Sequence, residues 1–300
     1  MKFVEPVDVK KIFDSTDIFL FDVDGVLKLG PNPIPGAISF IKDLRRRNKQ
    51  IGFVTNATSF SADDQRNRLS LFEATNDEIF TPHDAIVAYL QKINFQKDIF
   101  VISNHTTKKL LRESGYKIIQ LEDITTMPIE ESIKAFKDIS EKTIEICKNV
   151  GAVLVDMDFR FSHVNTQIAC TILRHFKDVL LLNSILDDSA PIGNNFILIG
   201  PKYYMDVIER HSNTKSLTLG KPATALLDAL KPAFKITDPS RVMFFGDNVM
   251  TDISFGSNCG FQTFLVLTGN TTKEDYKEWN YPNEYKPSYV AESIESMVLP

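Results

Sequence analysis

Short apolar runs alternate with longer amphipathic segments along the chain. The first run is Ile18-Phe19-Leu20-Phe21, and four apolar residues ending at a turn are typical of a strand buried on both faces of a parallel sheet. Residues 37–44 then place apolar side chains on one helical face, and Asn48 can end that helix. Similar apolar runs predict four more strands, over 51–54, 217–220, 242–245 and 263–267. This alternation predicts an α/β fold with a Rossmann-like, doubly wound parallel sheet.

A long insertion separates the second of these strands from the third. It carries apolar runs of its own, for instance 100–102, 152–155 and 196–199. A segment of this length can form a second α/β domain inserted in the first. We therefore expect residues 1–96 and 214–300 to form a core and residues 97–213 to form an inserted domain.

Composition narrows the class of protein. The chain has 300 residues, 43% hydrophobic and 24% charged, as in soluble globular proteins. A net charge of -5 argues against a nucleic-acid partner, which calls for clustered basic residues. The one basic run, Arg45-Arg46-Arg47, ends the predicted helix and complements its dipole.

Cysteine usage and hydropathy bear on location. Three cysteines without paired spacing suit a reducing compartment. The chain has neither a signal-peptide core nor a stretch approaching the roughly 18 apolar residues of a membrane span. These features predict a cytoplasmic protein with no membrane partner.

Polar residues follow most of the predicted strands. Because the carboxyl ends of parallel strands share one edge of a sheet, these side chains are expected to converge there. They are Asp22, Asp24, Thr55, Asn56, Lys221, Asp247 and Asp252. Four carboxylates placed close together repel one another and need a cation. Oxygen ligands without His or Cys indicate Mg²⁺, which commonly bridges carboxylates and a substrate phosphate.

The same residues suit phosphoryl chemistry. Lys221 supplies positive charge, and Thr55 and Asn56 supply hydrogen-bond donors for anionic oxygens. An aspartate is already ionised at neutral pH and needs no base to act as a nucleophile. A neighbouring carboxyl could protonate the leaving oxygen and later deprotonate water.

Four segments resemble, in order, the signature motifs of haloacid dehalogenase-superfamily phosphatases. The segments are Asp22-Val23-Asp24-Gly25-Val26-Leu27, Val54-Thr55-Asn56, Gly220-Lys221-Pro222 and Gly246-Asp247-Asn248-x-x-Thr251-Asp252-Ile253. The chain looks like the branch of 4-nitrophenylphosphatases, phosphoglycolate phosphatases and pyridoxal phosphate phosphatases, whose large α/β cap lies between the second and third motifs. The insertion in this chain falls at that place.

This resemblance implies a role for each site residue. Asp22 would be the nucleophile and Asp24 the general acid and base. Mg²⁺ would be held by the Asp22 carboxylate, the Asp24 backbone carbonyl and Asp247, with Asp252 supporting them. Thr55 and Asn56 would bind the phosphoryl group, and Lys221 would neutralise it. Related phosphatases also form homodimers through the cap.

Two departures from the family pattern concern specificity. Lys28 stands where relatives often place an aromatic residue, and its charge could favour a second anionic group on the substrate. In the cap, Asp158, Phe161 and His163 fill places that relatives give to Asp, an aromatic and Tyr. We expect His163 to be a surface or core residue rather than a catalytic one.

Together these features predict a Mg²⁺-dependent phosphomonoesterase. It would hydrolyse a small soluble phosphate ester, a phosphorylated metabolite, through an aspartyl-phosphate intermediate. The alternative is a catalytically weak or inactive protein that binds a phosphate ligand or serves regulation while retaining the fold.

Overall fold

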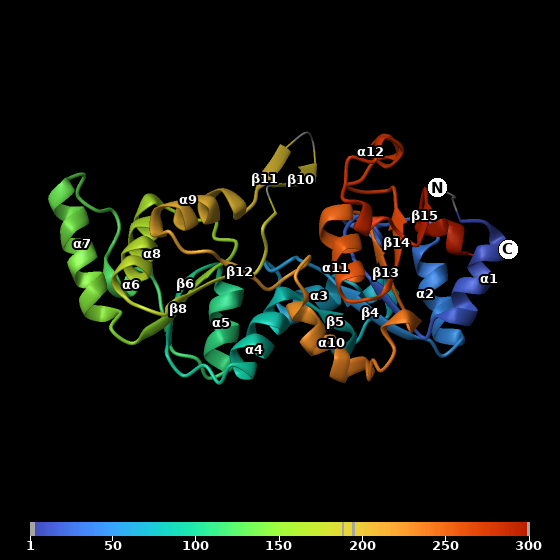
Figure 1. Ribbon diagram of the computed structural model, residues 1–300, viewed down its shortest axis with the longest axis horizontal. Helices are drawn as coiled ribbons and strands as arrows, with labels where there is room; N and C mark the ends of the chain where they lie inside the picture. Colours follow the sequence, from blue (N-terminus) through green and yellow to red (C-terminus); the bar gives the residue numbers. More distant parts are fainter. Residues whose placement is uncertain (1–3, 188, 194–195, 299–300) are drawn as a thin grey trace. The chain divides into compact units, whose positions relative to one another are not determined.

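The chain forms two compact units in the computed structural model, which describes residues 4–187, 189–193 and 196–298 (Figure 1). Unit 1 comprises residues 1–85 and 220–300, and unit 2 comprises residues 86–219. The sequence predicted changes of domain after residues 96 and 213, whereas the compact units change after residues 85 and 219.

Unit 1 contains a six-stranded parallel sheet in the order β15-β14-β13-β1-β4-β5. Its strands are β1 (Ile18–Phe21), β4 (Gln50–Val54), β5 (Ile79–Phe80), β13 (Val242–Gly246), β14 (Gln262–Val266) and β15 (Tyr289–Ala291). Phe21 of β1 lies opposite Phe53 of β4 and Phe245 of β13. The polar residues that follow these strands therefore emerge at one edge. The predicted doubly wound α/β fold is confirmed.

Helices cover both faces of this sheet. On one face, Phe40 of α2 (Ala37–Arg46) makes edge contacts with the rings of Phe19, Phe21 and Phe245. Helix α1 (Pro6–Ser15) joins the same apolar core. On the other face lie α10 (Leu227–Phe234) and α11 (Ser254–Asn258), whose Phe255 contacts Phe244. The remaining elements of unit 1 are β2 (Lys28–Leu29), β3 (Asn32–Pro33), α3 (Ala62–Arg68) and α12 (Lys273–Glu278), while α4 (Pro82–Lys92) continues into unit 2.

One predicted core strand was assigned to the wrong sheet. The run 217–220 forms only the two-residue strand β12 (Leu217–Thr218), which pairs with Leu182 and Asn183 of unit 2. The chain enters unit 1 directly afterwards, at Gly220. Lys221 therefore arrives on a loop instead of at the end of a core strand.

Unit 2 contains a five-stranded parallel sheet in the order β12-β9-β8-β6-β7. Its other strands are β6 (Asp98–Ile102), β7 (Ile118–Ile119), β8 (Val150–Val155) and β9 (Leu180–Asn183), and a separate antiparallel pair is formed by β10 (Ser189–Gly193) and β11 (Phe196–Ile199). Its helices are α5 (His105–Glu113), α6 (Leu121–Ile124), α7 (Ile133–Ile146), α8 (His163–His175) and α9 (Lys202–Ser212). The insertion thus has an α/β core of its own.

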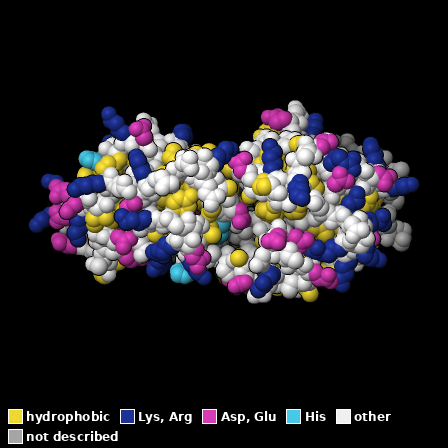
Figure 2. Space-filling model, turned by 90° about the horizontal axis from the view of Figure 1, so that it is seen from below, with side chains coloured by type: hydrophobic (Ala, Val, Ile, Leu, Met, Phe, Trp, Pro, Cys, Tyr) yellow, Lys and Arg dark blue, Asp and Glu magenta, His cyan; other side chains and the backbone are white. Residues whose placement is uncertain are grey.

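The surface carries both signs of charge. On the face drawn in Figure 2, Lys and Arg side chains are interspersed with Asp and Glu. Among the helices of the described residues, none is both long and apolar enough to cross a bilayer.

Candidate active site

Asp22 lies at the carboxyl end of β1, where its backbone N–H donates to the carbonyl of Phe245 at 2.8 Å. Its carboxylate is buried, and Oδ1 accepts a hydrogen bond from Lys221 Nζ at 2.6 Å. Burial raises the pKa of Asp22 well above its usual value, and the nearby Asp252 and Asp247 raise it further while Lys221 opposes them. The ion pair with Lys221 is therefore central to keeping this carboxylate ionised.

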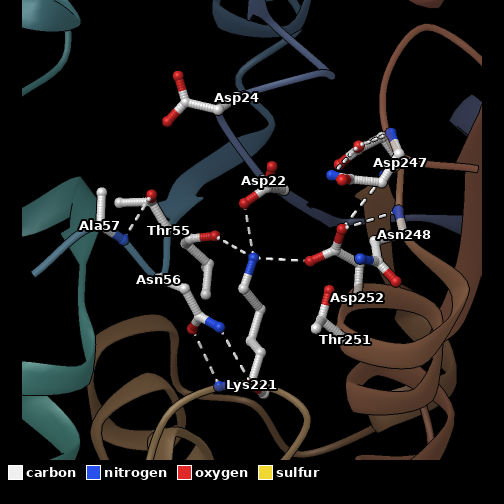
Figure 3. Close-up of polar contacts among 12 residues, drawn as sticks. Asp22, Asp24, Thr55, Asn56, Ala57, Lys221, Asp247, Asn248, Thr251 and Asp252 are labelled. Atoms are coloured by element: carbon white, nitrogen blue, oxygen red, sulfur yellow. Dashed lines mark hydrogen bonds and ion pairs between the residues drawn. The ribbon is translucent and has the colours of Figure 1, made fainter. Parts of the chain in front are cut away.

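The Lys221 ammonium lies at the centre of the site (Figure 3). Nζ donates to Asp22 Oδ1, to Asp252 Oδ1 at 2.7 Å and to the carbonyl of Val54 at 2.9 Å. Burial alone would lower the pKa of Lys221, but the carboxylates of Asp22 and Asp252 outweigh it and raise the pKa. The side chain is fully buried.

Asn56 fixes the loop that carries Lys221. Its Oδ1 accepts from the Lys221 backbone N–H at 3.1 Å, and its Nδ2 donates to the Lys221 carbonyl at 3.0 Å. These two hydrogen bonds hold the backbone of Lys221 in place, which a core strand would otherwise do. The sequence predicted a phosphate contact for Asn56, and in the structure its amide contacts the Lys221 backbone (Figure 3).

Asp247 directly follows β13, and Asp252 lies in the short π-helix η5 (Val249–Ile253) that comes next. Asp252 Oδ2 accepts the backbone N–H groups of Asp247 and Asn248, at 3.2 and 3.1 Å. Asp247 Oδ2 accepts two hydrogen bonds from Asn270, one from its backbone at 2.5 Å and one from its side chain at 2.8 Å. Burial and the neighbouring Asp252 raise the pKa of Asp247 to about 7. Asp252 thus shapes the turn that presents Asp247.

Glycines allow the backbone to approach these carboxylates. A Cβ at Gly269 would lie 2.0 Å from Asp247 Oδ2, and one at Gly246 would lie 2.1 Å from Asp252 Cβ. Gly25 has φ +93°, and a Cβ there would lie 2.6 Å from the Asp247 carboxyl carbon. Asn270 was not among the predicted site residues. The apolar run 263–267 could have indicated it, because this strand pairs with β13 and its end places residues 268–270 near Asp247.

Three carboxylates form a cluster that suits a hard cation. Asp22, Asp247 and Asp252 each offer an oxygen, and these oxygens lie within 4.8 Å of one another. One ammonium opposes three carboxylates, so negative charge is in excess. Among the described residues, no hydrogen bond reaches Asp22 Oδ2 or Asp247 Oδ1. Such an oxygen set fits Mg²⁺.

Asp24 lies apart from this cluster, contrary to the expectation that four carboxylates would meet. Its side chain points away from Lys221 (Figure 3) and forms an ion pair with Arg68, whose Nη2 contacts both carboxylate oxygens, at 2.9 and 2.8 Å. The carboxylate is 48% exposed. A positive φ at Gly25 turns the chain directly after Asp24, and Arg68 supplies the attraction that holds the side chain outward.

Thr55 follows β4 and is buried beside the cluster. Its backbone N–H donates to the carbonyl of Phe80 in β5 at 3.0 Å, and its Oγ1 accepts from the N–H of Ala57 at 3.2 Å. These contacts hold the hydroxyl in place at the sheet edge.

Lys28 and His163 have structural contacts. The Lys28 ammonium donates to the backbone carbonyl of Arg68 at 2.9 Å, and burial together with the Arg68 charge lowers its pKa. His163 begins α8 in unit 2, and its ring packs against Phe136 with centroids 5.3 Å apart.

Two family models match the chain. A model of haloacid dehalogenase-like hydrolases matches residues 19–117, and a related one, described as HAD-hydrolase-like, matches residues 218–297. The matched segments contain every residue of the site described above.

Curated relatives match over nearly the whole chain. Phosphoglycolate phosphatase 2 of Arabidopsis thaliana is 29% identical, covering 96% of this chain and 94% of its own. The 4-nitrophenylphosphatase of Schizosaccharomyces pombe is 29% identical, with 98% and 97% covered. The solved structure of a 4-nitrophenylphosphatase from Thermotoga maritima has the same fold, with a TM-score of 0.77, 24% identity, and 95% and 97% covered. The chain therefore belongs to the haloacid dehalogenase-like hydrolases.

Proposed function

We propose that this protein is a Mg²⁺-dependent phosphomonoesterase that hydrolyses a small phosphate ester through an aspartyl-phosphate on Asp22. The observation that carries the proposal is the buried cluster of Asp22, Asp247 and Asp252 around a single lysine. Relatives that cover nearly the whole chain are named as phosphatases, which supports the same reaction class.

Asp22 is the group that attacks phosphorus. One of its carboxylate oxygens forms a bond to phosphorus while the bond from phosphorus to the ester oxygen breaks. Lys221 holds Oδ1 at 2.6 Å, which keeps the carboxylate ionised and oriented in spite of its burial. Water then attacks the aspartyl-phosphate, releasing inorganic phosphate and restoring the Asp22 carboxylate.

Asp24 moves the proton. It gives a proton to the leaving alcohol oxygen in the first step and takes one from the attacking water in the second. In the structure this carboxylate is paired with Arg68, so its side chain has to leave Arg68 and turn toward Asp22 before it can act.

Lys221 and Thr55 bind the phosphoryl group. Lys221 offsets the negative charge on Asp22 and on the equatorial oxygens, and the Thr55 hydroxyl donates to one of them. Asn56 supports this step by holding the backbone of Lys221 on both sides. Asn56 is also proposed to contact the phosphoryl group.

The metal would be held by Asp22, Asp247 and the backbone carbonyl of Asp24. Asp252 supports these ligands through its hydrogen bonds to the N–H groups of Asp247 and Asn248. When bound, Mg²⁺ supplies positive charge against the three carboxylates and the phosphoryl oxygens.

The substrate is proposed to be a small phosphorylated metabolite. Relatives are named for phosphoglycolate, glycerol 3-phosphate and 4-nitrophenyl substrates. The alternative of an inactive, ligand-binding protein is not favoured, because Asp22, Asp247 and Asp252 are brought together around Lys221 and the relatives are named as phosphatases. A cytoplasmic location and a homodimer formed through residues 97–213 complete the proposal.

A phosphate-release assay tests this function. Purified protein is given a panel of phosphate esters with Mg²⁺ and with EDTA. We expect release only with the metal, and a loss of about 10⁴-fold or more in Asp22→Asn. Asp63→Asn, on an exposed side chain of α3, is the matched control and should keep full activity. Metal-independent release, or full activity in Asp22→Asn, would contradict the mechanism.

A further inference from the structure

We infer that Arg68 selects substrates that carry a second anionic group, by exchanging the Asp24 carboxylate for that group. The inference rests on the proposed function, since it names the substrate class of the same site. It gives a role to the outward position of Asp24, which the phosphatase mechanism alone leaves unexplained.

Arg68 is held in place before any ligand arrives. Its guanidinium lies over the ring of Phe60, 4.2 Å from the centroid, and its Nη1 donates to Gln65 Oε1 at 2.8 Å. Gln65 is buried and donates in turn to the carbonyl of Ala57 at 2.8 Å. The guanidinium is thus fixed from the loop that follows Thr55 and Asn56, and little side-chain entropy is lost when it binds an anion.

The anion that Arg68 binds in this structure is the general acid itself. A single nitrogen, Nη2, contacts both carboxylate oxygens of Asp24, at 2.9 and 2.8 Å, and the bonds are charge-assisted. The Arg68 side chain is 19% exposed, so the ion pair is reachable by a ligand. A carboxylate of the substrate has the same charge and shape as the one it would replace.

Charge around Arg68 favours this exchange. The ammonium of Lys28 is buried and donates to the backbone carbonyl of Arg68, and the Asp24 carboxylate that pairs with Arg68 also acts on this second cation through space. If Asp24 turns toward Asp22, both cations lose their nearby counter-charge. A substrate with a carboxylate or a second phosphate replaces that charge, whereas a neutral ester does not.

The expected signature is a preference expressed mainly in kcat. Both kinds of ester present the same phosphate to Lys221 and Asp22. Only the anionic ester also stabilises the state in which Asp24 is free to move its proton, and that state matters most at the chemical step. Removing Arg68 frees Asp24 for every ester and abolishes the distinction.

The test compares 2-phosphoglycolate, which carries a carboxylate, with glycerol 3-phosphate, which is neutral beyond its phosphate. We expect the wild type to prefer phosphoglycolate in kcat and in kcat/KM, and Arg68→Gln to reduce both preferences at least about tenfold, the effect of a single charge-assisted contact. Arg68→Lys keeps the charge but loses the guanidinium that lies over Phe60 and donates to Gln65, so it should retain part of the preference.

The matched control is Arg66→Gln, on the same helix, whose side chain is 49% exposed and pairs with Asp63. Its preference should equal that of the wild type. A wild type that favours the neutral ester, or an Arg68→Gln variant with the wild-type ratio, would overturn the inference. The melting temperature of Arg68→Gln is compared with that of the wild type. If Arg68→Gln is destabilised, the ester preference of Arg68→Lys is used instead.

Binding to a non-reacting variant separates this inference from the proposed function. Calorimetry on the Asp22→Asn variant measures its affinity for both esters without turnover. The same measurement on the double variant Asp22→Asn/Arg68→Gln shows how much of each affinity depends on Arg68. If no ester is hydrolysed by the wild type but phosphoglycolate binds in an Arg68-dependent manner, the phosphatase proposal fails while the anion site stands. Binding that does not depend on Arg68 would overturn the anion site alone.

Discussion

Two parallel sheets in this molecule place an aspartate directly after a buried strand, with different outcomes. In unit 2, Asp156 follows β8 and is completely buried. Its carboxylate accepts hydrogen bonds from the hydroxyls of Thr107 at 2.7 Å, Ser103 at 3.1 Å and Ser184. In unit 1, Asp22 follows β1 and meets two further carboxylates around Lys221.

The difference lies in what satisfies each carboxylate. Hydroxyl groups of three residues donate to both carboxylate oxygens of Asp156. The cluster in unit 1 has three carboxylates, one ammonium and two oxygens without a hydrogen bond from the described residues. Position at a strand end is common to both, and the excess of negative charge is what distinguishes a site for a cation and a phosphate.

The largest effect should come from removing Lys221, the ammonium that contacts the carboxylate cluster of unit 1. In Lys221→Met, Asp22 and Asp252 stay buried without a counter-charge, which costs about 3–5 kcal/mol in the free energy of unfolding and abolishes phosphate release. Urea unfolding in EDTA measures the loss. An unfolding free energy equal to that of the wild type would show that the charge excess is less important than we infer.

A double variant sharpens this experiment. Lys221→Met combined with Asp252→Asn removes one positive and one negative charge from contacting groups. We expect the double variant to lose less free energy of unfolding than the two single variants lose together. Each substitution removes the charge that the other substitution would leave buried without a partner. Additive losses would mean that the two groups do not interact as the 2.7 Å contact indicates.

Much of the fold followed from apolar runs. The runs at 18–21, 51–54, 242–245 and 263–267 became strands β1, β4, β13 and β14 of one sheet. The run at 217–220 failed because four apolar or small residues do not specify which sheet they join, and here only two of them pair, with unit 2. Short strands such as β5 and β15 gave too weak a pattern to be predicted.

The site was predictable as a set of residues and less so as a geometry. Strand ends that share an edge predicted that Asp22, Asp247 and Asp252 would meet, whereas Lys221 meets them from a loop held by Asn56 and not from the core strand that the sequence predicted. Spacing along the chain did not indicate that Asp24 would turn to Arg68, because that choice depends on a cation 44 positions away in the sequence. The same is true of Asn270, 23 positions from the Asp247 it contacts.

Binding of Mg²⁺ should stabilise the protein by a smaller amount. At a metal concentration about 100 times the dissociation constant, the gain is about 2.7 kcal/mol in the free energy of unfolding. Asp247→Asn should lose this gain, and Asp63→Asn, whose side chain is 78% exposed, should keep it. The melting temperature with Mg²⁺ and with EDTA gives the answer. An equal shift in wild type and Asp247→Asn would exclude Asp247 as a ligand.

The smallest effect should come from the carboxylate of unit 2. Asp156→Asn replaces one accepting oxygen with a donor that faces hydroxyl groups, and leaves part of the network unsatisfied, at a cost of about 2 kcal/mol. The Mg²⁺-dependent shift in melting temperature should stay as in the wild type. Asp158→Asn, two residues further along, is the matched control and should change stability by less than about 0.5 kcal/mol. If Asp156→Asn abolished the Mg²⁺-dependent shift in melting temperature, the metal would depend on the sheet edge of unit 2, and the cluster in unit 1 would not be the metal site.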